Sequence, residues 1–154
     1  MAAKTQNSSL PMLSCADGIA ASTSDFILLV GRVLLAWIFI RSGYGKLFDI
    51  AAYSNTFPGR GLMPALAYLA VPVEFFGGIA LLFGFATRYV AVVMIAFMLI
   101  ATFSSHRYWD FTDAAQRRFQ DASFWKNIAM LGGFFFLFVS GPGRFSVDGW
   151  LRGK

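Results

Sequence analysis

The sequence predicts an all-α integral membrane protein, a four-helix bundle with short interfacial segments in its first and third loops. Of its 154 residues, 57% are apolar and only 14% are charged, whereas a soluble domain carries about a quarter charged residues. Each membrane crossing needs about 20 apolar residues, so the chain has room for roughly four spanning helices and no separate soluble domain. We therefore expect a multi-pass protein surrounded by the lipid bilayer, with no nucleic-acid partner.

The apolar pattern divides the chain into three parts. Residues 1–25, polar and rich in Ala, Ser and Thr, are typical of a flexible tail; residues 26–143 form the transmembrane domain; residues 144–154 form a short basic tail. Within the domain, the spanning helices are expected at about 26–48, 65–84, 89–105 and 123–140.

The first predicted helix carries cations along one face. Asp25 is a plausible N-cap, because its carboxylate can accept from free backbone N–H groups. At 100° per residue one stripe contains Arg32, Ala36, Phe39, Gly43 and Lys46, while Arg41 points the opposite way. Arg32 and Lys46 lie roughly 21 Å apart at 1.5 Å per residue. Arg32 should face the bundle interior, whereas Lys46 either does so or extends to the interface.

The first loop, residues 49–64, contains its own short interfacial segment. Asp49 can cap a helix that continues through Phe57, and Pro58-Gly59-Arg60-Gly61 then ends it. The segment is either a lid over a pocket or a plain connector at headgroup level, and the connector is favoured.

Glu74, the only glutamate in the chain, lies within the second apolar stretch. A carboxylate in hydrocarbon costs several kcal/mol unless water, a cation or a proton relieves it. Pro72 removes a nearby backbone hydrogen bond, and Gly77 and Gly78 let a neighbouring helix approach. Glu74 is therefore either a functional acid or the buried half of a structural salt bridge.

Polar residues recur where the third and fourth helices meet the second long loop. His106 ends the third helix on the same side as Lys46, either as a helix cap or as a site residue. Residues 107–121 mix charges with aromatics, which is typical of an interfacial amphipathic segment. Lys126 and Asn127 occupy the first turn of the fourth helix, and one of them can reach the interior. A lysine there opposes the helix dipole, so helix stabilisation explains it poorly.

Together these residues define a candidate site. Glu74 is the candidate catalytic residue, which would carry or accept a proton, and the candidate ligand-binding residues are Arg32, Lys46, His106, Lys126 and Asn127. If they converge, they form a cavity with a net positive field, suited to an oxyanion, an acidic headgroup or a quinone carbonyl. If every charge is paired internally, the cluster is structural instead.

No metal site is expected. The single Cys15 cannot form an internal disulfide or a CxxC pair, and the single His106 cannot provide bis-histidine haem ligation or a histidine cluster. No cofactor motif is evident, so quinone is the candidate cofactor, and electrons in any redox role must come from a ligand or a partner protein.

Motifs across all four helices resemble the DoxX family of small four-helix membrane proteins. They are Arg32 with Gly43-Tyr44-Gly45-Lys46-Leu47, Glu74-Phe75-Phe76-Gly77-Gly78, Gly84-Phe85-Ala86-Thr87-Arg88, His106, Lys126-Asn127 and Gly141-Pro142-Gly143-Arg144. The family takes its name from a subunit of an archaeal thiosulfate:quinone oxidoreductase, and other members resemble membrane partners of oxidoreductase or thiol-stress systems. Many members carry a histidine where this chain has Ser42, which weakens a histidine-based role in the first helix.

The resemblance implies a bacterial inner-membrane protein that is at most a subunit of a membrane oxidoreductase. It would serve as the membrane subunit or partner of an oxidoreductase system, with an intramembrane polar pocket for quinone or a small anionic or thiol-derived ligand. The alternative is a non-catalytic membrane scaffold or assembly partner, because family resemblance indicates fold better than activity.

Overall fold

The computed structural model describes residues 11–153, with side chains from residue 15 onward, and confirms the all-α fold. The long helices are α1 (Pro11–Leu47), α3 (Ala67–Phe83), α4 (Thr87–Ser105) and α5 (Ala114–Ser140). The short elements are α2 (Ile50–Ser54), η1 (Pro58–Arg60), η2 (Pro64–Leu66), η3 (Tyr108–Asp110) and α6 (Val147–Arg152). Four helices of the described chain are long and apolar enough to cross a membrane, as predicted.

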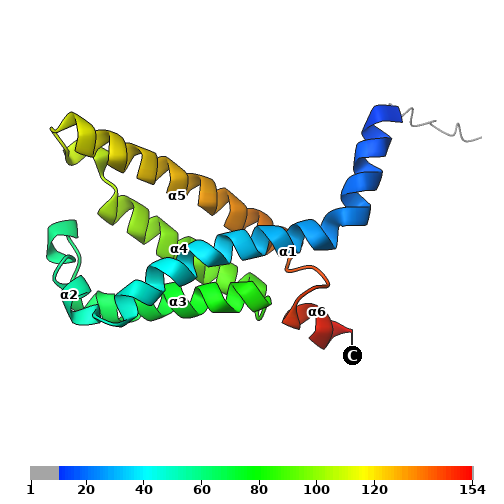
Figure 1. Cartoon of the computed structure of the whole chain (residues 1–154), viewed down its shortest axis with the longest axis horizontal. Helices are drawn as coiled ribbons and strands as arrows, with labels where there is room; N and C mark the ends of the chain where they lie inside the picture. The colour runs from blue at the N-terminus through cyan, green and yellow to red at the C-terminus, as the bar shows by residue number, and fades with distance from the viewer. Residues whose placement is uncertain (1–10, 154) are drawn as a thin grey trace, which may run out of the picture.

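The bundle is built from two helix pairs. Helix α1 packs chiefly against α3, and α4 packs chiefly against α5. The pairs lie close together toward the end that carries α6 and diverge toward the end that carries α2 (Figure 1). The diverging end holds the C-terminus of α1 and the α4–α5 connection, so polar residues from distant parts of the sequence meet there.

Small residues bring α1 and α3 into close contact. A Cβ on Gly78 would lie 2.9 Å from the Ile40 side chain and 3.0 Å from its backbone nitrogen. A Cβ on Gly43 would lie 2.9 Å from backbone atoms of Phe75. Helices in lipid associate through such close packing, because lipid tails are as apolar as the helix surfaces. The predicted close approach at Gly78 is confirmed, and Gly43 makes a second one.

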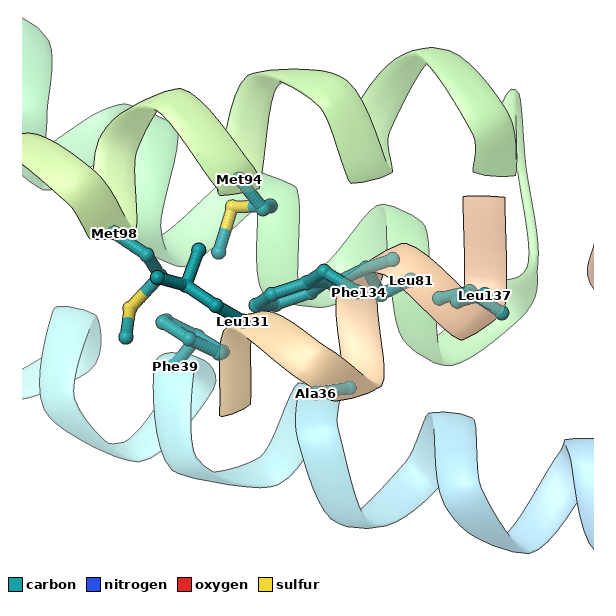
Figure 2. Close-up of a cluster of buried hydrophobic side chains, with 8 residues drawn as sticks. All are labelled: Ala36, Phe39, Leu81, Met94, Met98, Leu131, Phe134 and Leu137. Carbon is teal, nitrogen blue, oxygen red and sulfur yellow. The ribbon is translucent and has the colours of Figure 1, made fainter. Parts of the chain in front are cut away.

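The predicted stripe is the buried face of α1. Arg32, Ala36, Phe39 and Gly43 are all buried, Lys46 is partly buried, and Arg41 is exposed. Ala36 and Phe39 join an apolar cluster with Leu81, Met94, Met98, Leu131, Phe134 and Leu137, to which each long helix contributes (Figure 2). This cluster fills the middle of the bundle.

The predicted start of the first helix was wrong. Helix α1 begins at Pro11, not Phe26, and its N-terminal part extends beyond the bundle (Figure 1). Within the polar stretch, Ser22 and Thr23 donate hydroxyl hydrogen bonds to the Ile19 carbonyl, so their side chains are satisfied inside the helix. Asp25 therefore lies inside the helix and is no N-cap. The part of the predicted tail at residues 1–10 lies outside the described residues.

The last segment of the chain is not a simple tail, because it closes the α6 end of the bundle. Asp25 accepts a hydrogen bond from the backbone N–H of Arg144 at 2.8 Å. Asp148 of α6 accepts from the backbone N–H groups of Ala86 and Thr87 at 2.7 and 2.8 Å. A carboxylate here interacts favourably with the positive end of the α4 dipole, so residues 141–153 cap α4 from a distance.

The fourth spanning helix also begins earlier than predicted. Helix α5 starts at Ala114 rather than near Ser123, so much of the predicted interfacial segment is helical. Asp113 is the N-cap and accepts from the backbone N–H of Gln116 at 2.8 Å. The spacing of Asp113 and Gln116 is that of a capping box, a signal present in the sequence.

In the first loop, α2 ends at Ser54 rather than Phe57, although Asp49 caps it as predicted.

We expect Gly43→Ala to destabilise the protein by about 1–3 kcal/mol, because the new methyl group meets the α3 backbone, which cannot move aside. Gly45→Ala is the matched control in the same helix, since a Cβ there meets nothing within 4 Å. It should be neutral or stabilising, because alanine has the higher helix propensity. Thermal unfolding in detergent measures both, and equal stability of the two variants would contradict the contact.

Asp148 predicts a pH dependence of stability. Burial alone would raise the pKa of Asp148, but hydrogen bonds from Thr87 and Ala86 and the charge of Arg152 outweigh it and hold the pKa below the usual 3.8. A depressed carboxyl pKa contributes stability that is present above the unfolded value and lost as pH falls through the folded value. At neutral pH, Asp148→Asn should therefore cost about 1 kcal/mol. The difference in melting temperature between wild type and variant should shrink below pH 3.8; a difference independent of pH would refute the role of the charge.

Candidate functional site

A polar cavity of about 390 Å3 lies at the diverging end of the bundle. Helix α1 contributes Ser42 and Lys46, α3 contributes Glu74, and α5 contributes Gln120, Lys126 and Asn127. Ser105 and His106 line it from the end of α4, and Tyr53 and Arg60 from the first loop. Five of the six candidate site residues thus line one cavity. Phe39 and Met98 of the core also line it.

Lys46 and Glu74 form an ion pair between α1 and α3. The Lys46 Nζ donates to both carboxylate oxygens of Glu74, at 2.7 and 3.0 Å, and to the Ser42 hydroxyl at 2.9 Å. The Glu74 side chain is 7% exposed and that of Lys46 is 26% exposed. The pair compensates the buried carboxylate, and Lys46 remains open to the cavity.

Two further contacts hold the cavity wall in place. The His106 Nδ1 lies 2.8 Å from the Gln120 Oε1, which joins the end of α4 to α5. The Arg60 guanidinium donates to the Tyr53 hydroxyl and the Ser105 hydroxyl, both at 3.1 Å. The first loop is therefore attached to α4 and forms a wall of the cavity. Of the two predictions for this loop, a lid over a pocket and a plain connector, these contacts favour the lid.

Asn127 and Lys126 are cavity residues whose side chains are not hydrogen-bonded to any residue that the structure describes. Asn127 is only 6% exposed, yet its side chain makes no hydrogen bond with any residue that the structure describes. Lys126 is exposed at the outer edge of the cavity and likewise makes no ion pair within residues 15–153. Both residues line the cavity, whereas the sequence predicted that one of them could. The Asn127 amide is therefore available to hydrogen-bond a ligand or water in the cavity.

Arg32 does not join the site. Its guanidinium donates to the carbonyl oxygens of Pro142 and Phe145 at the α6 end of the bundle. Gly84 makes room for it: a Cβ there would lie 2.6 Å from the Arg32 Nη1, and φ at this glycine is +66°. The predicted convergence of Arg32 with Glu74 was wrong, because carbonyls of the C-terminal segment hold the charge instead.

The sequence analysis missed Tyr53, Arg60, Ser105 and Gln120 as cavity residues. Tyr53 lies under two cations, with the Lys46 Nζ 4.9 Å and the Arg60 Cζ 5.2 Å from its ring centroid. In the sequence, the only indication of their role was that Tyr53 and Arg60 occur in a loop expected at the membrane surface.

The charges of the cavity are unbalanced. Lys46, Arg60 and Lys126 are cationic, and Glu74 is the only carboxylate among the lining residues. No group of three His, Cys, Asp or Glu residues in the described part of the chain could hold a metal ion. The site therefore offers N–H donors and positive charge to a ligand that carries hydrogen-bond acceptors.

The DoxX family model matches residues 27–107, which include α1 from Ile27 onward, α3, α4 and the cavity loop. The chain belongs to the DoxX family. This DoxX protein is 34% identical over 130 residues to "Inner membrane protein YqjF" of Escherichia coli (strain K12), which covers 84% of the chain and 95% of the relative. It is 35% identical over 125 residues to "Inner membrane protein YphA" of the same organism, covering 79% of the chain and 88% of the relative.

These relatives and the four spanning helices make this DoxX protein a multi-pass protein of the bacterial inner membrane. The predicted family and localisation are confirmed. No solved structure matches the chain at a significant level.

The ion pair predicts non-additive mutational effects. Lys46→Met leaves a buried carboxylate without its cation and should cost about 2 kcal/mol, less than a fully buried pair because Lys46 is partly exposed. The double variant Lys46→Met/Glu74→Gln lacks both charges of the pair, so no carboxylate is left without its cation. Most of the stability lost in Lys46→Met should therefore return. Melting temperatures of the wild type, both single variants and the double variant in detergent measure the coupling. A double variant no more stable than Lys46→Met would exclude the pair as the cause.

Proposed function

We propose that this DoxX protein binds a quinone, or a small anionic or thiol-derived ligand, in the polar cavity and serves as the membrane subunit or partner of an oxidoreductase system. The observation that carries the proposal is Asn127, which is buried in the cavity wall and has no described protein partner. The cavity volume of about 390 Å3 falls within the ~300–1,000 Å3 typical of small-molecule sites.

The lining residues suit such a ligand. Lys126 and Asn127 would donate hydrogen bonds to carbonyl or anionic oxygens, since neither is engaged elsewhere in the described chain. Arg60 adds positive charge from the first loop. A bound quinone supplies two-electron chemistry coupled to proton uptake. Glu74 could hold a proton beside the ligand, and Lys46, 2.7 Å from its Oε2, would stabilise the ionised form.

A second candidate function is a non-catalytic membrane scaffold or assembly partner. The Lys46–Glu74 pair favours it, because the only glutamate of the chain is compensated internally and needs no ligand. Purification in mild detergent distinguishes the two functions. A stable oxidoreductase partner supports the first, and varied partners without bound ligand support the second.

Ligand binding can be tested with two probes, a benzoquinone without a side chain and inorganic thiosulfate. At least one should raise the melting temperature of the purified protein. Asn127→Leu and Lys126→Met should each weaken its binding by about tenfold or more, as expected for a lost hydrogen bond to a polar or charged group.

Arg118→Met is the control, since it removes an exposed cation from α5 outside the cavity lining. It should leave probe binding unchanged. The proposal would be refuted if neither probe binds the wild type. It would also be refuted if the Asn127 and Lys126 variants bind the probe as tightly as the wild type does.

A further inference from the structure

A second cavity, an apolar groove of about 230 Å3, lies beside the polar one. One wall consists of Leu69, Ala70 and Val73 of α3, whose spacing places them on one helix face, together with Leu66 at the end of η2. The α4 wall runs from Val93 to Ser104, roughly 16 Å at 1.5 Å per residue. Phe57 and Leu62 of the first loop complete it at one end.

The groove is open along its side. Leu69 is 64% exposed and Ile100 is 60% exposed, although both are large apolar residues on spanning helices. Side chains exposed at this position on a transmembrane bundle face lipid tails rather than water. A molecule dissolved in the bilayer can therefore enter the groove laterally.

The groove and the polar cavity share part of their walls. Tyr53, Arg60, Phe97, Ala101 and Ser105 line both. Arg60 stands at this junction with its guanidinium fixed by hydrogen bonds to Tyr53 and Ser105. The groove therefore adjoins the polar cavity across a shared wall, where Arg60 is a fixed cation between the apolar side chains of the groove and the donors of Asn127 and Lys126.

We propose that the natural ligand is an amphiphile, with one apolar chain in the groove and a hydrogen-bond-accepting head in the polar cavity. This inference rests on the proposed function and narrows its ligand class. A small hydrophilic anion uses the polar cavity alone and leaves the groove without an occupant of its own. An amphiphile matches both: the oxygens of its head meet Lys126, Asn127 and Arg60, and its chain replaces lipid along α3 and α4.

The two cavities contribute differently to binding. A chain that moves from lipid into the groove gains no hydrophobic free energy, because both surroundings are apolar. Affinity then comes mainly from the head, while the groove selects chain shape and aligns the head with the donors. Filling the groove should exclude tailed ligands without affecting ligands that lack a tail.

The test uses the full-length protein in phosphatidylcholine nanodiscs, with ligand expressed per mole of lipid to remove simple partitioning. The probes are a benzoquinone without a side chain, the same quinone with a ten-carbon chain, and a ten-carbon fatty acid. Binding is followed by tryptophan fluorescence, with empty discs as the baseline. At least one tailed probe should bind wild type, and Ala70→Phe should weaken it by about tenfold while binding of the tail-less quinone is retained.

Ala96→Phe is the matched control, because Ala96 is exposed on α4 and lines neither cavity. A second pair guards against misfolding of Ala70→Phe: Val93→Phe shortens the groove, whereas its neighbour Val92→Phe adds the same ring outside it, and the two valines are 49% and 50% exposed.

The outcomes separate the two proposals. Selective loss of a tailed probe in the groove variants supports the amphiphile, and the probe affected identifies a quinone or a carboxylate head. Unchanged binding of tailed probes in both groove variants overturns this inference but leaves the proposed function standing. Failure of every probe to bind wild type overturns both.

Discussion

The structure depends on how it compensates charges buried in an apolar chain. Helix α1 carries two of them. At one end Lys46 pairs with Glu74 of α3, and at the other Arg32 donates to carbonyls of the C-terminal segment. Because an uncompensated charge in hydrocarbon costs several kcal/mol, these contacts fix the register of α1 against α3 and hold residues 141–153 on the bundle. The charges therefore act as fixed points of α1 at the two ends of the bundle.

Between these points, packing decides where the bundle is closed. Gly43 and Gly78 allow close contact of α1 with α3, and a cluster of apolar side chains fills the middle (Figure 2). Beyond the cluster the two helix pairs diverge (Figure 1). A cavity is tolerated at that end because most of its polar groups satisfy one another: Lys46 with Glu74, His106 with Gln120, and Arg60 with Tyr53.

Helical periodicity was enough to predict the number of spanning helices, the buried face of α1 and most of the cavity. Antiparallel topology alone placed Lys46, His106, Lys126 and Asn127 toward one end, with Glu74 nearer the middle, and the structure shows all five lining one cavity. The predicted helix starts were wrong because they were set at the edges of the apolar stretches. Helix α1 continues through a polar segment whose hydroxyls, such as that of Thr23, bond within the helix, and Asp113 caps α5 well before its apolar stretch. The placement of Arg32 in the site was wrong for a non-local reason. Its partners are the backbone carbonyls of Pro142 and Phe145, and backbone groups produce no recognisable pattern in the sequence.

The free donors of the cavity are the feature that favours the proposed binding site over a purely structural cluster. A cluster that served only to fix helix packing would have its groups paired, as Lys46 and Glu74 are. Asn127 instead remains 6% exposed without a partner in the described chain, and Lys126 adds an unpaired cation at the cavity edge. The predicted place of both residues in the first turn was wrong, because α5 begins at Ala114, so the dipole of the helix does not explain Lys126. Under the proposed function, an acceptor-bearing ligand would bind these two groups, and the adjoining groove would hold its apolar chain on the lipid side of Arg60.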